Sequence, residues 1–315
     1  MATKSAKSFR KKLKAEGCFY TPEPLARYMM NLLPDPAAVT TVYDPTCGGG
    51  GLLRIFPAEV KKYGQELDSE QLELCRKEIP NFTGYVGDLL HDPAFMDMRF
   101  DTIMANPPFS IKWEAFSDPR WDAAPVLPPN GKSDYAFILH CVHMLTDTGT
   151  AVVMCFPGVL YRGQREGKIR QWMVEQNLIE KVIMMPKDKF GKFEDTNIDL
   201  AILVIKKHRD STDITFIDEE HENRRTVQLE EVAANKFNLS VSTYVEPPDT
   251  REPIDIVAVT KQADDNIIAN LRHSLYASQF VYQVFGGGDF PALLQRAQGV
   301  LDEFKGGDSD EKRGR

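Results

Sequence analysis

The residues with the most specific chemistry in this sequence are Asn106, Pro107, Pro108 and Phe109. They follow the apolar run 100–105 and end it, because two prolines continue neither a ladder nor a helix. The Asn106 side-chain oxygen and the Pro107 carbonyl can accept the two N–H groups of an exocyclic purine amine. That would expose the nitrogen lone pair to a methyl donor, with the acceptors held rigid by the prolines. Phe109 offers a ring for stacking on a base. Taken alone, the motif also fits an Asx-Pro loop with a buried phenylalanine.

A second candidate site is the glycine-rich turn that follows Asp44 and contains Gly48 and Gly50. In doubly wound sheets, ligands bind at the carboxyl ends of the strands, where such a turn allows close approach to the backbone. A dinucleotide site needs the pattern G-x-G-x-x-G, but Leu53 occupies the position of the third glycine. No Gly-Lys-Ser/Thr follows, so a phosphate-binding loop is also excluded.

Three acidic residues follow three successive expected strands: Asp44, Glu66 and Asp88. Glu66 is placed to accept hydrogen bonds from a ribose diol, and Asp88 to accept one from an adenine amino group. Each carboxylate alone would pass as an ordinary surface residue, but the ordered set is specific. A cofactor with a cationic amino-acid part, a ribose, an adenine and no phosphate fits this set, which points to S-adenosylmethionine.

Alternating strand and helix patterns place these residues in an α/β fold. The expected strands cover residues 41–45, 63–67, 82–88, 100–106, 149–157, 178–186 and 200–207. The expected helices cover residues 22–33, 69–79 (with a serine cap), 133–145 and 167–177, and another follows the glycine run. Such alternation predicts a doubly wound, mostly parallel sheet. The last two strands lack a long connecting helix, which predicts an antiparallel hairpin at one edge.

The chain divides into four predicted segments. Residues 1–16 form a basic flexible tail, 17–247 the main α/β domain, 248–303 a helical segment and 304–315 a disordered tail. Within the main domain, 110–132 is expected to be an irregular proline-rich loop, 213–220 another strand and 236–248 an extended segment. The two C-terminal helices are separated by the glycine run 286–288.

Composition sets limits on location and partners. The net charge is −8 and the calculated pI about 5.4, which argues weakly against a stand-alone DNA binder. The N-terminus lacks the apolar stretch of a secretory signal and no run is long enough to span a membrane, so a cytoplasmic protein is expected. Five scattered cysteines predict free thiols. His140, Cys141 and His143 lie in an apolar helical run and are assigned to packing; no metal site is predicted.

Several motifs occur in an order that resembles one known family. They are GCFYTPEPLARYM, VYDPTCGGGG, YGQELD, GDLL, FDTIMANPPF, KSDYAFILH, FPGVLYRGQREGKIRQW and KFNLSVSTYV, and they cover residues 17–245. The sequence resembles the DNA-modification (M) subunits of type I restriction–modification systems, which are adenine-N6 DNA methyltransferases. The resemblance implies a class I S-adenosylmethionine-dependent methyltransferase fold with a seven-stranded sheet.

The resemblance also implies the site residues. The catalytic set is Asn106, Pro107, Pro108 and Phe109. The cofactor-binding set is Tyr20, Thr21, Pro22, Asp44, Thr46, Cys47, Gly48, Gly50, Glu66, Asp88, Leu89 and Asn106. Within it, residues 20–22 would flank the methionine part, the turn after Asp44 would form the main cradle, and Asp88 and Leu89 would surround the adenine. Asp134 and Tyr135 would lie on the cofactor or target side of the cleft.

Two departures from the family pattern affect the expected partners. The usual glycine motif reads DPACGSGG, so Thr46 and Gly49 differ mildly. Family members also carry a long helical domain before the FYTP motif, where this sequence has about 16 residues, so a truncated or phage-borne relative is expected. The implied partners are double-stranded DNA, a specificity subunit and a second copy of the chain. We expect residues 253–303 to dock on the specificity subunit. The short segment before the FYTP motif leaves open whether a nuclease also binds.

Two other functions remain open from the sequence. Planar nitrogens in RNA or in a protein glutamine pose the same chemical problem, so a methyltransferase acting on either is one alternative. A scaffold subunit without activity is the other, although an intact NPPF and glycine turn argue against it.

Overall fold

The computed structural model describes residues 21–186, 199–246, 255–286 and 288–307. The chain forms two compact units, Met1–Pro248 and Asp249–Arg315. The predicted tail 1–16, the residue Tyr20 and the end of the chain after 307 lie outside the described residues.

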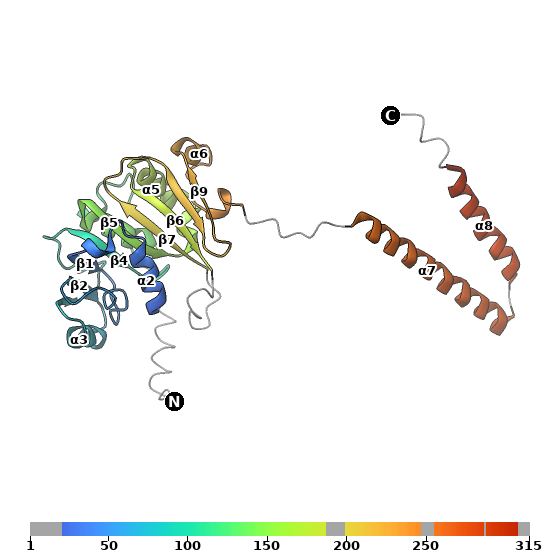
Figure 1. Ribbon diagram of the computed structural model, residues 1–315, viewed down its shortest axis with the longest axis horizontal. Helices are drawn as coiled ribbons and strands as arrows, with labels where there is room; N and C mark the ends of the chain where they lie inside the picture. The colour runs from blue at the N-terminus through green and yellow to red at the C-terminus, as the bar shows by residue number, and fades with distance from the viewer. Residues whose placement is uncertain (1–20, 187–198, 247–254, 287, 308–315) are drawn as a thin grey trace. The chain divides into compact units, whose positions relative to one another are not determined.

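The first unit is built on a nine-stranded sheet in the order β3-β2-β1-β4-β5-β7-β6-β8-β9 (Figure 1). Its strands are β1 Thr41–Asp44, β2 Lys61–Glu66, β3 Phe82–Val86, β4 Phe100–Ala105, β5 Leu145–Cys155, β6 Ile179–Met185, β7 Leu200–Lys206, β8 Ile214–Asp218 and β9 Asn223–Val227. Strands β3, β2, β1, β4 and β5 pair in parallel, and β7 runs antiparallel between β5 and β6. The predicted fold class, a mostly parallel α/β sheet with an antiparallel hairpin, is confirmed.

The sheet extends further than the sequence indicated. Strand β8, expected over 213–220, pairs in parallel with β6, and β9 pairs antiparallel with β8. The β6–β7 hairpin therefore lies inside the sheet, not at its edge. Strand β9 was missed because its first four residues are exposed and polar, so no alternating apolar pattern marks it. The described part of 236–248 holds the short 3-10 helix η4 Val241–Thr243 where an extended segment was expected.

The helices of this unit follow the predicted order except for α6, which was not predicted, and two local features also differ. They are α2 Glu23–Asn31, α3 Ser69–Glu78, α4 Asp134–Met144, α5 Gln164–Glu175 and α6 Leu229–Ala234, with the 3-10 turns η1 Pro36–Ala38, η2 Pro119–Trp121 and η3 Pro157–Leu160. Asp68, not the predicted serine, caps α3 by accepting from the Glu70 and Gln71 amides at 2.8 and 3.3 Å. The helix expected after the glycine run is a series of turns, because Pro57 follows too soon for a helix to propagate.

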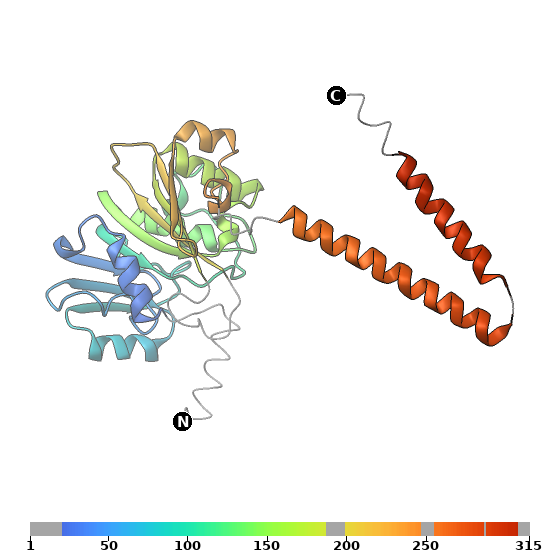
Figure 2. The same cartoon turned by 45° about the vertical axis from the view of Figure 1, so that its right-hand side comes forward.

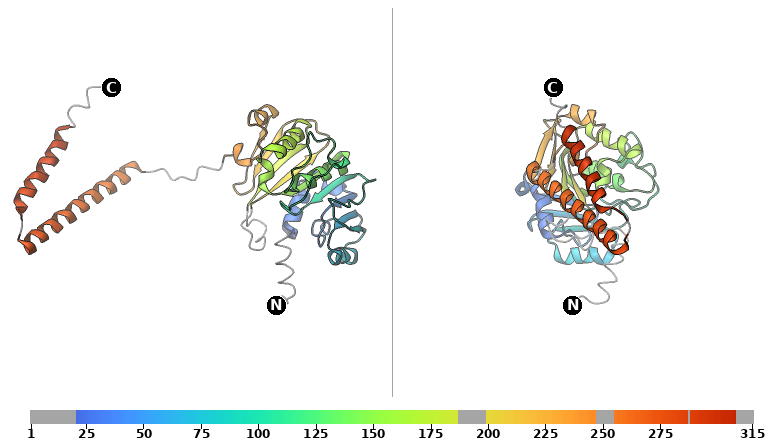
Figure 3. Two further views of the ribbon diagram at one scale, coloured as in Figure 1. Left: turned by 180° about the vertical axis from the view of Figure 1, so that it is seen from behind. Right: turned by 90° about the vertical axis from the view of Figure 1, so that its right-hand side faces the viewer.

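Alternate residues of the strands face two hydrophobic clusters, one on each side of the sheet. One cluster joins strand residues such as Val42 and Met104 to α2 and α3. The other joins residues such as Tyr43 and Ile103 to α4, α5 and α6. Figure 1 shows α2 in front of the twisted sheet, and the rear view in Figure 3 brings α5 to the front. The central strands, such as β4 and β7, are buried on both faces, as expected for a doubly wound sheet.

The described residues of the second unit form two helices, α7 Ile256–Phe285 and α8 Phe290–Gly307 (Figure 2). The Asp255 carboxylate caps α7 by accepting from the Ala258 amide at 3.0 Å, and Gly286 ends the helix in the left-handed conformation. Helix α8 continues four residues past the predicted limit at 303. No residue of α7 is buried. Within the described ranges, no helix is long and apolar enough to cross a membrane.

Candidate active site

The candidate site lies where four neighbouring strands end. Strands β3, β2, β1 and β4 are adjacent and parallel, so their carboxyl ends meet at one edge of the sheet. Asp44 and Glu66 are the last residues of β1 and β2, and Asn106 follows the last residue of β4. Asp88 is the second residue after the end of β3. The sheet therefore brings the predicted carboxylates and the NPPF motif to the same edge.

Glu66 ties the end of β2 to the glycine turn. Its Oε2 accepts a hydrogen bond from the Gly48 amide at 2.8 Å, and its Oε1 accepts one from the Asp68 amide at 2.9 Å. The Cys47 amide donates to the Gln65 carbonyl at 2.9 Å. Three hydrogen bonds thus fix the turn and the carboxylate relative to each other. Leu67, directly after Glu66, is 70% exposed at the same edge.

The glycines of the turn differ in how much space surrounds them. Gly48 and Gly50 both have positive φ, 50° and 80°, which favours glycine. A Cβ at Gly50 would lie 2.3 Å from Ile79 Cδ1 and 3.0 Å from Cys75 Sγ, so this glycine is closed in against α3. A Cβ at Gly48 would meet no described atom within 4 Å. The Gly48 side of the turn therefore faces open space that a ligand can occupy.

Asp44 is a buried carboxylate beside this turn. Its Oδ1 accepts from the Thr46 amide at 3.0 Å, and the residue is 2% exposed. Burial raises the pKa of the Asp44 carboxyl well above its usual range, and the Thr46 hydrogen bond only partly opposes this shift. The buried Thr46 hydroxyl has no hydrogen-bond partner within the described part of the chain. A cationic ligand would favour the ionised form of Asp44.

Thr21 brings three of the sequence motifs together. The Asn106 Nδ2 donates to Thr21 Oγ1 at 3.0 Å. On the other side, the Thr21 carbonyl oxygen would lie 2.9 Å from a Cβ added to Gly51, so the two main chains are in close contact. Pro22 then caps α2. The described part of the FYTP segment thus lies between the glycine turn and NPPF.

The NPPF motif leaves β4 as a rigid, partly covered segment. Pro107 is buried, whereas Asn106, Pro108 and Phe109 are half-buried. The Phe109 ring packs at the border of the cluster that contains α2 and α3. Its stacking on a target base stays a prediction.

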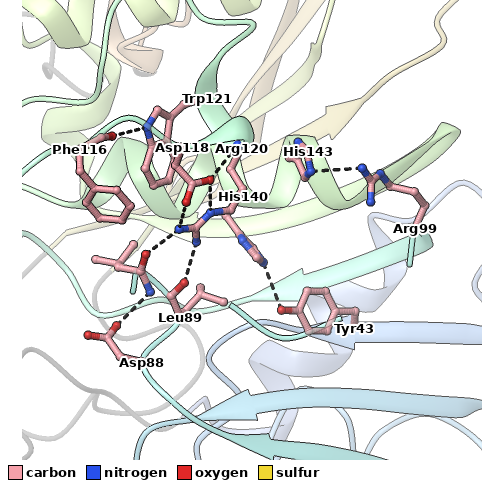
Figure 4. Close-up of polar contacts among 11 residues, drawn as sticks. Tyr43, Asp88, Leu89, Arg99, Phe116, Asp118, Arg120, Trp121, His140 and His143 are labelled. Atoms are coloured by element: carbon pink, nitrogen blue, oxygen red, sulfur yellow. Dashed lines mark hydrogen bonds and ion pairs between the residues drawn. The ribbon is translucent and has the colours of Figure 1, made fainter. Parts of the chain in front are cut away.

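Asp88 and Leu89 lie in the turn after β3, and their surroundings include residues that the sequence reasoning missed. Asp88 accepts from the Leu90 amide at 2.9 Å and lies 2.8 Å from His91 Nδ1. The Leu89 and Leu90 carbonyls each accept a hydrogen bond at 2.6 Å from the buried guanidinium of Arg120 (Figure 4). Arg120 therefore holds the segment around the predicted adenine pocket.

Asp118 completes this buried ion pair. Its carboxylate accepts from Arg120 Nε and Nη2, both at 2.8 Å (Figure 4). Burial acts to raise the pKa of Asp118, but the hydrogen bonds and charge of Arg120 outweigh it, so the net pKa is lowered. Trp121 is buried beside the pair, and its ring packs edge-on against Trp113 and Phe116. The sequence signal was available, since an Asp-Pro-Arg-Trp run inside a loop combines a pairable charge with a large aromatic ring.

Asp134 and Tyr135, which the resemblance assigned to one side of the cleft, have different surroundings. Tyr135 is 1% exposed and its hydroxyl donates to the Val159 carbonyl at 2.9 Å, so it is part of the core. Asp134 instead contacts Ser110, directly after NPPF.

His140, which the sequence assigned to packing, is buried, with its Nε2 3.1 Å from the Tyr43 hydroxyl (Figure 4). In the described residues, no three His, Cys, Asp or Glu side chains form a group that could hold a metal ion.

Comparison with solved structures defines the fold class. The methyltransferase subunit of a type I restriction–modification system from Streptococcus thermophilus superposes with a TM-score of 0.66 at 30% identity, over 72% of this chain and 59% of that chain. The type I restriction enzyme EcoKI M protein has the same fold, with a TM-score of 0.57 at 16% identity over 89% of this chain and 75% of that one. The first unit has a class I S-adenosylmethionine-dependent methyltransferase fold.

Sequence comparison defines the family. Residues 6–226 match the family described as N-6 DNA Methylase, and the chain belongs to this family. The methylase subunit of the type I restriction enzyme MpnII from Mycoplasma pneumoniae is 30% identical over 313 residues, which cover 80% of this chain and 57% of that subunit. The chain spans about half the length of such relatives.

Replacing Arg120 tests the buried ion pair. Arg120→Met leaves the Asp118 carboxylate without its cation and two main-chain carbonyls without donors, so we expect a loss of about 3–5 kcal/mol of unfolding free energy. Denaturant unfolding measures this, with Arg76→Met, which breaks an exposed ion pair, as a control expected to cost under about 1 kcal/mol. Because the folded-state pKa of Asp118 is lowered, its contribution is present above the unfolded pKa near 4 and is lost as pH falls through the folded value. The deficit should therefore shrink in acid; a deficit equal to the control's would contradict the assignment.

Proposed function

We propose that the chain transfers a methyl group from S-adenosylmethionine to the N6 amino group of adenine in double-stranded DNA. The observation that carries this proposal is the position of Thr21, which hydrogen-bonds Asn106 and lies against the glycine turn at Gly51. These contacts connect the proposed cofactor cradle to the motif that suits an exocyclic amine. Membership of the N-6 DNA methylase family supports the same reaction.

The residues around the glycine turn fit S-adenosylmethionine. The buried Asp44 carboxylate suits the cationic amino-acid part, and the Thr46 hydroxyl is a polar group that a ligand could satisfy. Glu66 already accepts one hydrogen bond on each oxygen, which leaves acceptor capacity for a ribose diol. The exposed Leu67 and the Asp88–Leu89 segment would then surround the adenine. The cofactor supplies a methyl group on a positively charged sulfur.

Asn106 and Pro107 would act on the target base through hydrogen bonding. With Nδ2 donating to Thr21, the acceptor atom of the Asn106 side chain is Oδ1. This oxygen and the Pro107 carbonyl would accept the two N–H groups of the adenine amine and hold its lone pair out of conjugation with the ring. The amine proton becomes acidic only after methylation, so no side chain has to remove it first. Rigid acceptors of this kind stabilise developing charge without reorganisation.

The target adenine must leave the DNA duplex to reach this site. The adenine amino group is paired inside a duplex, so the base has to be flipped out of the stack.

Several relatives are methylase subunits of type I restriction enzymes. We therefore propose that this chain serves as a cytoplasmic modification subunit and that a specificity subunit supplies sequence recognition. A second copy of the chain would complete the assembly.

The second unit offers a surface for such a specificity subunit. Helix α7 exposes large apolar side chains along much of its length, including Ile267, Ile268, Leu271, Phe280 and Val281. An amphipathic helix with an exposed apolar side normally packs against another element. We propose that residues 253–303 dock on the specificity subunit.

Asn106→Ala tests the reaction. Loss of a preorganised acceptor should lower methyl transfer by at least about 10²–10³-fold, while the dissociation constant for S-adenosylmethionine stays within about threefold. The assay is transfer of labelled methyl from S-adenosylmethionine to unmethylated genomic DNA, with nucleoside analysis, in the presence and absence of the specificity subunit. Asn235→Ala, an exposed change at the C-cap of α6, is the control.

The same assay separates the alternatives. Wild-type product on RNA or on a glutamine-containing protein instead of DNA would replace the proposed substrate. Cofactor binding without transfer to any acceptor, even with the specificity subunit, would contradict the enzymatic proposal. A large loss of cofactor binding in Asn106→Ala would mean that this residue belongs to the cofactor site.

Asp44→Asn tests the cofactor cradle through its pH dependence. Because the pKa of Asp44 is raised, the carboxyl is mostly protonated at pH values below that pKa, and a cation binds the ionised form better. Cofactor affinity should therefore rise with pH, by up to about tenfold per unit, until pH exceeds the pKa. Asn keeps the Oδ1 acceptor for Thr46 but not the charge, so affinity should fall by at least about tenfold and this rise should vanish. Calorimetric titration measures both, with Glu70→Gln as control; an unchanged pH profile would refute the role.

Altering the second unit tests the docking proposal. Deleting residues 250–315, or replacing Ile267 and Leu271 by Glu in the full chain, should abolish co-purification with the specificity subunit because charges replace the apolar contact surface. Asp265→Ala on the same helix is the control and should leave the complex intact. Unchanged complex formation in the altered chains would rule out docking through this unit.

A further inference from the structure

The residue after NPPF has an unusual backbone conformation. Ser110 has φ +52°, in the left-handed region that side-chain-bearing residues seldom adopt. Such strain persists only where the surrounding structure holds it, and it is frequent beside functional groups. A change of Ser110 to a common conformation would redirect the chain and displace Phe109 and Pro108. The conformation at Ser110 therefore determines how the motif is presented.

One carboxylate holds Ser110 in this conformation. The Ser110 amide donates to Asp134 Oδ1 at 3.0 Å, and the Ser110 hydroxyl donates to Asp134 Oδ2 at 3.2 Å. Both carboxylate oxygens thus accept from the same residue. Asp134 is 4% exposed and is the first residue of α4, where the helix dipole favours a negative charge. Next to it, the Ser133 amide donates to the Ile111 carbonyl at 3.2 Å, which aligns the two segments.

Asp134 is in turn oriented from the neighbouring strand. Arg162, which follows β5 and η3, places Nη1 3.6 Å from Asp134 Oδ2 and 3.5 Å from Glu166 Oε1. Its guanidinium also lies over the Phe156 ring, 5.1 Å from the centroid. The contacts Ser110–Asp134–Arg162–Glu166 therefore connect the segment after β4 to the segment after β5. Because these strands are adjacent and parallel, the connection spans the side of the candidate site next to NPPF.

We propose that Asp134 is a positioning residue: through Ser110 it fixes the orientation of the NPPF motif for methyl transfer. This inference rests on the proposed function for its activity readout, but its structural part does not. Each oxygen of Asp134 accepts a hydrogen bond from Ser110, so the carboxylate acts on the target amine through the backbone of the motif. Arg162 and Glu166 keep the carboxylate in place.

The test uses the conformational preference of glycine. Asp134→Ala should lower kcat for methyl transfer by about 10²-fold and change the S-adenosylmethionine KM by less than about threefold, because the motif is misplaced while the cofactor cradle is intact. Glycine adopts positive φ without the penalty that alanine pays. Adding Ser110→Gly to Asp134→Ala should therefore recover about five- to tenfold of the lost kcat, whereas adding Ser110→Ala should recover none. Asp134→Asn, which retains volume and the Oδ1 acceptor, should lose less than Asp134→Ala and serves where the alanine variant fails to fold.

Hydrogen–deuterium exchange supplies a readout that does not depend on activity. Exchange in the peptide 106–112 should be faster in Asp134→Ala than in wild type. The control is Asp101→Ala, at the opposite end of β4, where the carboxylate accepts from Thr146 Oγ1 at 2.7 Å; it should leave that peptide unchanged.

The outcomes separate the two proposals. Equal recovery by glycine and alanine at Ser110, or unchanged exchange at 106–112 in Asp134→Ala, would overturn the positioning role. A wild-type chain that transfers no methyl group, even with the specificity subunit, would overturn the proposed function, and the exchange result would then decide the structural role of Asp134 alone.

Discussion

The site depends on the parallel pairing of β1 with β2 and β4. This pairing places the last residues of these strands at one edge, so that residues far apart in the sequence become neighbours. The edge alone does not fix their geometry, because each strand is followed by a loop. Hydrogen bonds complete it: Glu66 holds the glycine turn, and Asn106 reaches Thr21. Apolar packing sets the frame, and a few polar contacts at its edge set the positions of the functional groups.

The polar groups at this edge serve two purposes. Some stabilise the loops, as Arg120 does by joining two carbonyls and the Asp118 carboxylate. Others, such as the Thr46 hydroxyl and the open side of Gly48, have no such structural partner in the described residues. A protein interior normally satisfies its buried polar atoms. Groups left without partners beside an open turn are therefore more informative about ligands than groups that are already bonded.

The sequence predicted the fold class and the order of the elements because apolar periodicity and turn residues report on local structure. It predicted the edge that carries Asp44, Glu66 and Asn106 for the same reason, since strand ends are visible in the pattern. It did not predict β9, whose exposed polar residues pair only because β8 is already there, or the turns after the glycine run. The distant contacts of Arg120 and Asp134 were not predicted, although the Asp118–Arg120 charge pair is visible in the sequence. Arg120 binds the main-chain carbonyls of Leu89 and Leu90, and Asp134 binds Ser110; no local pattern encodes contacts between such distant segments.

The individual glycines of the turn differ in the constraints that limit their substitution during evolution. Gly50 is enclosed by Ile79 and Cys75 and has a φ of 80°, so a side chain there would need a smaller residue at position 79 and would still strain the backbone. Gly48 has no such neighbour and is restricted only by its backbone angle and by whatever ligand faces it. Two residues that look equivalent in the run of glycines therefore belong to separate selective regimes. Covariation between positions 50 and 79 among related chains would record packing, whereas invariance at position 48 would record the ligand.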